Sequence, residues 1–257
     1  MCGFTGIWWG EADPPRDADA IAARMVASIA HRGPDEGSWI RGPRGIVGFR
    51  RLSIIDPAGG HQPVRSPGGR IEALLNGEIY NHRDLRPAVE ADDGPLPSGS
   101  DAEVIPGLYR RHGDAFVERL SGMFAICVAD HERRRLVLWR DRFGIKPMFH
   151  ARVGPWLLFG SELKSILASG LLEPEIDRAS LAATLERMHV PGPWTMVAGI
   201  QSLPPGGRLR MDADGRVQVD RWFRAVPRPP ARSERPDPAR LRAKLDEAVA
   251  AQLLIHI

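Results

Sequence analysis

The chain opens with Met1-Cys2-Gly3-Phe4-Thr5-Gly6-Ile7, and this stretch governs how the rest of the sequence is interpreted. Removal of the initiator methionine would leave Cys2 first, with a thiol and a free α-amino group on one residue. A thiolate is a strong nucleophile, and an α-amino group with an ordinary pKa of about 7.7–8.0 can serve as a local base. The alternative interpretation is a small, buried cysteine in the core. The remaining chain has to distinguish the two.

The apolar pattern predicts a mixed α and β fold. Strands are expected over 2–9, 37–41, 45–49, 52–55, 71–75, 123–129, 136–139, 148–152 and 156–159. Helices are expected over 18–30, 82–91, 101–111, 161–170 and 177–188, with Asn81, Ser100 or Asp101, Ser161 and Asp177 as caps. Pro87 and Pro106 fall inside two of these helices, where a kink or a shorter helix is expected. Short strand-to-strand turns favour antiparallel sheets over a doubly wound parallel sheet.

Composition narrows the classes of protein. A chain of 257 residues with 43% hydrophobic residues can bury a sizeable core, and no apolar run is long enough to span a membrane. Two cysteines give no disulfide framework, which favours a cytoplasmic location. The net charge is +3, but the densest basic run, 133–135, follows acidic residues in a predicted hairpin turn. We therefore expect neither membrane insertion nor nucleic-acid binding.

Three further stretches carry candidate chemistry, each beside a simpler interpretation. Arg51 could grip a substrate carboxylate through two parallel hydrogen bonds, or lie exposed at a strand edge. Asn76-Gly77-Glu78 is typical of a type I′ hairpin turn, but the Asn76 amide and the Gly77 N–H could instead form an oxyanion hole. Asp101 could cap a helix or receive a substrate ammonium group.

Other reactive residues point away from metals and phosphates. His31, His61 and His82 lack ligand spacing with one another or with carboxylates, so no metal site is expected. Cys127 lies inside an apolar run and is predicted to be a core residue. No glycine-rich loop followed by lysine is present, and no cofactor is expected in this chain.

Taken together, the motifs resemble the glutaminase domain of class II glutamine amidotransferases. The resemblance rests on the opening stretch, His-Arg-Gly-Pro-Asp at 31–35, Arg-Leu-Ser-Ile-Ile-Asp at 51–56, Asn-Gly-Glu-Ile-Tyr-Asn at 76–81 and Gly-Ser-Asp at 99–101. Within that group, the segments at 120–125, 140–148, 160–165 and 203–206 are similar to asparagine synthetases. The similarity runs in order along almost the whole chain.

This resemblance implies an N-terminal-nucleophile hydrolase fold, a four-layer αββα sandwich with two antiparallel sheets. It also implies roles. Cys2 would attack the side-chain amide of glutamine, with its own amino group shuttling the proton. Asn76 and Gly77 would form the oxyanion hole. The implied substrate-binding residues are Arg51 for the α-carboxylate, and Glu78 and Asp101 for the α-amino group.

The resemblance also sets expectations for domains and partners. We expect a glutaminase domain over 2–210, a linker over 211–236 and the start of a truncated synthetase domain over 237–257. The expected partners are glutamine, a synthetase domain or subunit that receives ammonia, and, as an option, a second copy in a homodimer. ATP and Mg²⁺ are implied for the synthetase domain alone. Two alternatives stay open: a non-catalytic glutamine-binding fragment, and the glutaminase half of a relative that amidates another carboxylate.

Overall fold

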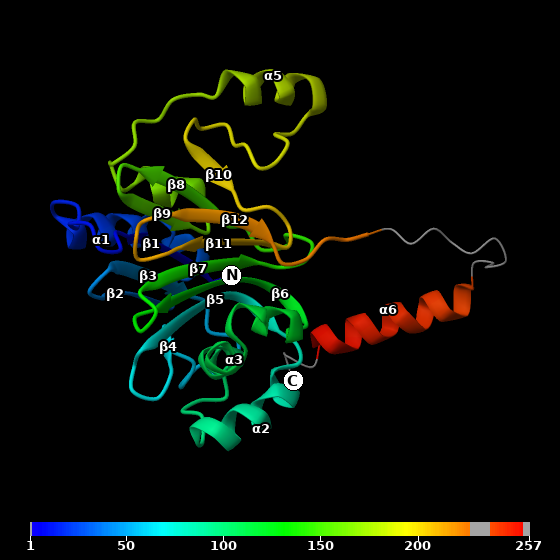
Figure 1. Ribbon diagram of the computed structural model, residues 1–257. Coiled ribbons are helices and arrows are strands. Elements are labelled where there is room, and N and C mark those ends of the chain that lie inside the picture. The colour runs from blue at the N-terminus through cyan, green and yellow to red at the C-terminus, as the bar shows by residue number, and fades with distance from the viewer. Residues whose placement is uncertain (1, 227–236, 254–257) are drawn as a thin grey trace.

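The structure is a computed structural model that describes residues 2–226 and 237–253. Two six-stranded antiparallel sheets lie face to face (Figure 1). The first sheet has the order β10-β8-β9-β1-β3-β2. Its strands are β1 (Gly3–Trp8), β2 (Glu36–Arg41), β3 (Gly45–Arg51), β8 (Phe149–Val153), β9 (Trp156–Gly160) and β10 (Ile200–Ser202).

The second sheet has the order β12-β11-β7-β6-β5-β4. Its strands are β4 (Val64–Arg65), β5 (Ile71–Ile79), β6 (Gly122–Asp130), β7 (Arg135–Arg140), β11 (Gly207–Met211) and β12 (Val217–Arg221). All of the strand pairs in both sheets are antiparallel, as the short turns predict.

Helices cover the outer face of each sheet, which completes four layers. Over the first sheet lie α1 (Ala18–Ser28), the 3₁₀ turn η1 (Ala30–Arg32) and α4 (Leu163–Leu167). Over the second lie α2 (His82–Asp93), η2 (Asp101–Glu103), α3 (Val104–His112) and η3 (Gly113–Arg119). A separate apolar cluster fills each of the three interfaces, so the core between the sheets is distinct from the two beneath the helices.

The period of two along a strand sorts side chains between these clusters. On β1, Phe4 and Trp8 point into the core between the sheets, whereas Ile7 points toward α1. Cys2, two residues before Phe4, packs against the same central core. On β5, Leu74 also faces the central core, and Asn76 has the same parity. Cys2 and Asn76 are therefore on the inner faces of opposite sheets.

Two further helices lie apart from the sandwich layers. The predicted cap of α5 (Arg178–Arg187) is confirmed, because the Asp177 carboxylate accepts a hydrogen bond of 2.7 Å from the Ser180 N–H. The other is α6 (Pro238–Leu253), none of whose residues is buried. Among the described helices, we find none with the length and apolar character needed to cross a membrane.

Tertiary contacts overturn three local predictions. Residues 52–55 form a loop and not a strand, because the chain folds back there around a buried arginine. Asn76-Gly77 is not a hairpin turn, since β5 continues through it and pairs with β6. Ser161 does not cap a helix: α4 begins after Glu162, and the Ser161 hydroxyl bonds to other strands.

The two prolines behave differently from each other. Pro87 lies inside α2, which continues through it to Asp93. Pro106 is the third residue of α3, in the first helical turn, where a backbone N–H has no partner within the helix. The helix that was expected to be disturbed near Asp101 therefore starts later, after a 3₁₀ turn capped by the Ser100 hydroxyl. Asn81 is the N-cap residue of α2, as predicted, but its side chain makes no capping hydrogen bond and instead contacts the backbone of Arg119 and Ser121.

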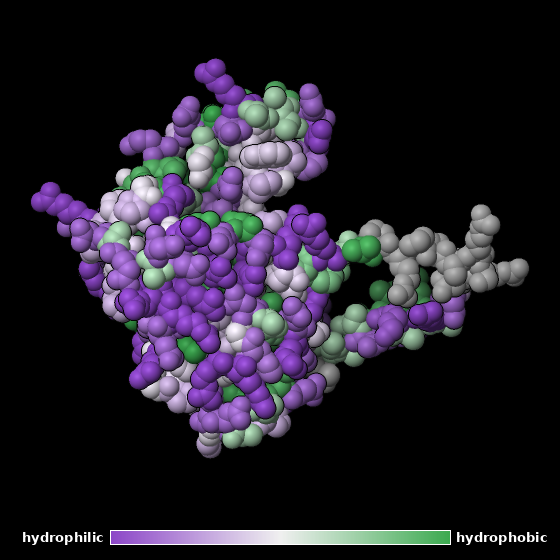
Figure 2. Space-filling view, in the orientation of Figure 1, coloured by the Kyte–Doolittle hydropathy of each residue, from purple (hydrophilic) through white to green (hydrophobic). Residues whose placement is uncertain are grey.

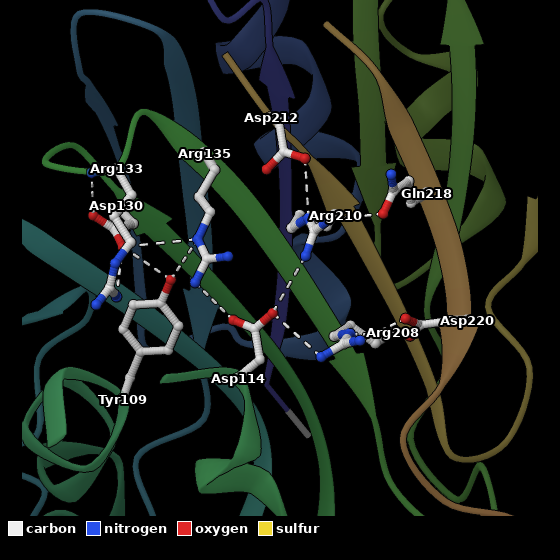
Figure 3. Close-up of polar contacts among 10 residues, drawn as sticks. All are labelled: Tyr109, Asp114, Asp130, Arg133, Arg135, Arg208, Arg210, Asp212, Gln218 and Asp220. Carbon is white, nitrogen blue, oxygen red and sulfur yellow. Dashed lines mark hydrogen bonds and ion pairs between the residues drawn. The ribbon is translucent and has the colours of Figure 1, made fainter. Parts of the chain in front are cut away.

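An arginine-rich cluster ties η3 to the second sheet; we call it the Asp114 network (Figure 3). Its members are Tyr109, Asp114, Asp130, Arg133, Arg135, Arg208, Arg210, Asp212, Gln218 and Asp220. Asp114 accepts from Arg135 at 2.7 Å and Arg208 at 3.2 Å, and lies 3.8 Å from Arg210. The network thus joins η3 to β7 and β11 through charge-assisted hydrogen bonds.

The domain boundaries stay a prediction. The second sheet continues through β12 to Arg221, which lies within the range predicted as linker. The last part of the predicted linker, residues 227–236, lies outside the described part of the chain, and so do residues 254–257.

Candidate active site

Five of the six predicted site residues line one cavity of about 50 Å³ at the edge of the central core. They are Cys2, Arg51, Gly77, Glu78 and Asp101. The remaining lining residues are Leu52, Ile54, Ile55, Gly60, Gln62, Leu75 and Ser100. The sixth predicted residue, Asn76, is fully buried and does not line the cavity. Cys2 is therefore close to a cation, to carboxylates and to the β5 backbone.

Backbone contacts hold the Cys2 thiol in place. The Leu52 N–H lies 3.4 Å from Sγ, and the thiol reaches the Leu52 carbonyl at 3.5 Å. On the main chain, the Arg32 guanidinium donates to the Cys2 carbonyl at 3.0 Å. Burial raises the pKa of the Cys2 thiol, and the Leu52 N–H partly offsets that effect. The thiol is consequently mostly protonated at neutral pH.

Arg51 is buried because the loop after β3 wraps around its guanidinium. It donates to the carbonyls of Asp56 at 2.7 Å and of Ile55 and Pro57 at 3.2 Å. Glu36 lies 3.7 Å away, at the limit of an ion pair. Neutral carbonyls thus orient the guanidinium without cancelling its charge. The interpretation of Arg51 as an exposed strand-edge residue is wrong, since its exposed fraction is 4%.

The wrap itself depends on Asp56, which has a left-handed backbone with φ of 45°. Its carboxylate accepts from the Gly59 N–H at 3.0 Å and the Gly99 N–H at 2.7 Å. Gly99 is two residues before Asp101. Asp56 therefore joins the loop that holds Arg51 to the segment that carries Asp101.

Asn76 and Gly77 lie in β5 beside the cavity. The Asn76 carboxamide nitrogen is 3.4 Å from Ser161 Oγ, and its oxygen has no hydrogen-bond partner among the described residues. Gly77 has φ of +148°, and an added Cβ would lie 2.1 Å from the Met123 carbonyl oxygen. Only glycine fits so close to β6. The glycine is thus explained by strand packing rather than by a turn.

Two carboxylates complete the cavity. Glu78 Oε2 is buried and has no hydrogen-bond partner among the described residues. Asp101 Oδ2 accepts from the Ile79 N–H at 2.8 Å, which ties η2 to β5. Burial, reinforced by the charge of Glu78, raises the pKa of Asp101 to about 6. An ammonium group placed between these carboxylates would relieve both the unmet acceptor and the mutual repulsion.

Four residues that shape the site had no predicted part in it: Arg32, Leu52, Asp56 and Ser161. Arg32 and Asp56 belong to quoted motifs, so a signal for them was present. Leu52 acts through its backbone, which no side-chain pattern reveals. Ser161 was predicted only as a helix cap, which is a common position for serine. Within residues 2–226 and 237–253, we find no group of three or more metal-ligating side chains.

Comparison with solved structures defines the fold. The glutamine phosphoribosylpyrophosphate amidotransferase of B. subtilis, solved with ADP and GMP, superposes with a TM-score of 0.63 at 19% identity. The match covers 88% of this chain and 50% of that one. The two antiparallel sheets between helical layers are therefore the N-terminal-nucleophile sandwich that the motifs predict.

Comparison with curated sequences defines the family. Asparagine synthetase 1 of Bacillus subtilis is 33% identical over 228 residues, which is 88% of this chain and 36% of the relative. The asparagine synthetase of Asparagus officinalis is 36% identical over 171 residues, or 66% of this chain and 28% of the relative. The chain thus spans little more than a third of these relatives, or less. The glutamine amidotransferase domain profile matches residues 1–223, and the chain belongs to that family.

Proposed function

We propose that this chain hydrolyses glutamine to glutamate and ammonia through a thioester on Cys2. The observation that carries the proposal is the one cavity that Cys2 lines together with the cation of Arg51 and the carboxylates of Glu78 and Asp101. Such a pattern of charge complements an α-amino acid, whose carboxylate and ammonium groups lie on one carbon. The membership in a glutamine amidotransferase family supports glutamine as that amino acid.

Binding follows from the charges. The Arg51 guanidinium, oriented by three carbonyls, would pair with the α-carboxylate of glutamine. Glu78 Oε2 and Asp101 would accept from the α-ammonium group.

Attack on the side-chain amide would start from the neutral thiol. As the Cys2 sulfur bonds to the amide carbon, the thiol proton passes to the α-amino group of the same residue and then to the departing nitrogen. The carbon–nitrogen bond breaks, ammonia leaves, and a glutamyl thioester remains. Water then attacks the thioester, which releases glutamate and restores the thiol. The N–H of Gly77 and the Asn76 carboxamide would stabilise the oxyanion in both steps.

We further propose that the ammonia serves a synthetase domain or subunit of the asparagine-synthetase type. The support is the identity of 33% and 36% to relatives named asparagine synthetase, over segments that are a minor part of their length. ATP and Mg²⁺ would act in that synthetase unit. A relative that amidates another carboxylate would share the same glutaminase site. A cytoplasmic setting and an optional homodimer complete this proposal.

The proposal is tested by measuring glutamate and ammonia release from glutamine. Intact-mass spectrometry first establishes that Met1 has been removed, because a retained methionine would block the amino group. Equimolar glutamate and ammonia are expected from the processed protein, and none above background from Cys2→Ala. Glutamine binding without turnover would instead support a non-catalytic binding fragment. Equal turnover in Cys2→Ala would contradict the thioester mechanism.

A further inference from the structure

The Ser161 hydroxyl is the polar link between the two sheets beside the cavity. Ser161 follows β9, is fully buried, and accepts from the Phe4 N–H at 3.1 Å. The same oxygen lies 3.4 Å from the Asn76 carboxamide nitrogen. Phe4 is two residues after Cys2 on β1, whereas Asn76 belongs to β5 of the other sheet. One hydroxyl therefore contacts both the strand of the nucleophile and the side chain assigned to the oxyanion hole.

With the Asn76 nitrogen facing Ser161, the hydrogen-bond donors and acceptors around this hydroxyl do not match. A serine hydroxyl has one proton to donate and can accept two hydrogen bonds. If Asn76 Nδ2 and the Phe4 N–H both donate to Ser161 Oγ, the hydroxyl proton finds no acceptor among the described residues. The Asn76 oxygen, also buried, then finds no donor. An unmet polar group in a dry interior destabilises the folded state.

Rotation of the carboxamide by 180° gives both the hydroxyl proton and the carboxamide oxygen a partner, and leaves the NH₂ group as the unmatched one. The oxygen and nitrogen of an asparagine side chain have nearly the same shape, so the exchange leaves the packing unchanged. Ser161 then donates its proton to the Asn76 oxygen while still accepting from the Phe4 N–H. The Asn76 NH₂ group takes the position in which the oxygen has no partner. Its N–H donors then have no acceptor among the described residues, and the oxyanion of a reacting substrate would supply one.

We infer that Ser161 is a positioning residue, which holds the Asn76 carboxamide with its NH₂ free to stabilise the oxyanion. This inference rests on the proposed glutamine hydrolysis and adds a residue outside the cavity lining to its machinery. The Ser161 N–H also donates to the Phe4 carbonyl of β1 at 2.9 Å. Ser161 therefore fixes the position of Asn76 relative to the strand that carries Cys2. It acts through Asn76 and touches no reacting atom.

Ser165 supplies a matched control. It is also fully buried and follows Ser161 by four residues. Its hydroxyl likewise bonds to β1, at 3.2 Å from Thr5 Oγ1, and donates to the Glu162 carbonyl at 2.8 Å. It has no bond to Asn76. Ser165→Ala therefore removes a buried hydroxyl from the same segment without touching the proposed link.

The test measures glutamine hydrolysis by the Met1-processed full chain and its variants. Ser161→Ala is expected to lower kcat about tenfold to a hundredfold with KM for glutamine nearly unchanged, since the lost interaction belongs to the transition state. Ser161→Cys, which keeps the size but donates weakly, is expected to fall between wild type and Ser161→Ala. Ser165→Ala is expected to stay within about threefold of wild type.

Two readouts separate positioning from a general structural effect. In an Asn76→Ala background, Ser161→Ala is expected to change kcat by less than about threefold, because the two residues act as a unit. Alkylation of Cys2 by iodoacetamide forms no oxyanion, so its rate is expected to be equal in wild type and Ser161→Ala. Ser161→Ala and Ser161→Cys at wild-type kcat, effects that multiply with Asn76→Ala, or slowed alkylation would each overturn the inference. An inactive processed wild type would contradict the proposed function first, and the inference with it.

Discussion

Arg51 and the arginines around Asp114 are partly or fully buried, but they meet different partners. The Asp114 network contains four arginines and four aspartates, so every cation has a carboxylate nearby (Figure 3). Arg51 instead bonds to three backbone carbonyls, and the one carboxylate paired with it among the described residues, that of Glu36, is 3.7 Å away. Carbonyls orient a guanidinium without neutralising it. The arginines of the network are thus neutralised within the protein, whereas Arg51 keeps its charge for the α-carboxylate that we propose it binds.

The molecular surface differs from both of these buried regions. In Figure 2 the visible face is covered mostly by hydrophilic side chains, with apolar residues scattered among them. Two of the most exposed apolar side chains belong to the end of α5: Leu185 is 77% exposed and Met188 is 89% exposed. The lining of the cavity beside Cys2 combines its charged groups with the aliphatic side chains of Leu52, Ile54, Ile55 and Leu75.

The largest expected effect after loss of Cys2 comes from the oxyanion donor. Asn76→Ala is expected to lower kcat by about 10²–10³ with little change in KM, because the donor acts on the transition state. Steady-state kinetics with glutamine measure this. Asn81→Ala, which removes a carboxamide just beyond the same strand, should stay near wild type. A reduced affinity without a change in kcat would place Asn76 in substrate binding instead.

A matched pair of substitutions tests the comparison of the two arginine sites. Arg51→Lys is expected to raise KM for glutamine about ten- to a hundredfold, because an ammonium cannot reproduce the fixed fork that grips a carboxylate. Arg208→Lys, in the Asp114 network, should leave KM within about twofold. The comparison breaks if the two variants change KM equally.

The pH dependence of binding tests the second charge in the cavity. Asp101 has its pKa raised to about 6, above its ordinary value, so its carboxylate is charged above that pH and protonated below it. KM for glutamine is therefore expected to rise as the pH falls through 6, by up to about tenfold per unit. Asp101→Asn should have a high KM that no longer varies over this range. A KM that stays constant in wild type between pH 5 and 7 would remove Asp101 from binding.

The smallest effect on activity, and the clearest on stability, is expected in the network. Asp114→Asn leaves three arginines with a neutral partner and is expected to lower the free energy of unfolding by about 2 kcal/mol, with kcat within twofold of wild type. Urea denaturation followed by circular dichroism measures the loss. The assignment of this cluster to stability is contradicted if activity falls while stability does not.

The parts of the fold that follow local periodicity could be predicted from the sequence. β6 and β7 lie where two apolar runs flank a polar turn, and Asp177 caps α5 as its position indicates. Local signals failed where distant strands decide. Asn76-Gly77 has a strong turn signal, but pairing of β5 with β6 across nine positions overrides it. Pairing partners that lie far along the chain are not visible in a short window.

The candidate site residues could be predicted because their side chains belong to motifs. The prediction was incomplete because some contacts in the site are made by the backbone. Cys2, Arg51 and Asp101 meet at one cavity as expected. The loop over 52–60 was predicted in part as a strand, since Leu52–Ile55 is apolar. Its carbonyls turn inward to Arg51 instead, and only the folded structure shows that its Leu52 backbone contacts the Cys2 sulfur.

The central claim is that Cys2 carries the glutamyl group, and the covalent intermediate tests it most directly. The processed protein would be mixed with glutamine, quenched in acid during turnover, digested and analysed by mass spectrometry. The account predicts a glutamyl group on the peptide that begins with Cys2, absent in Cys2→Ala. Glutamate release at the full rate with that peptide unmodified, or with the glutamyl group on another residue, would contradict it.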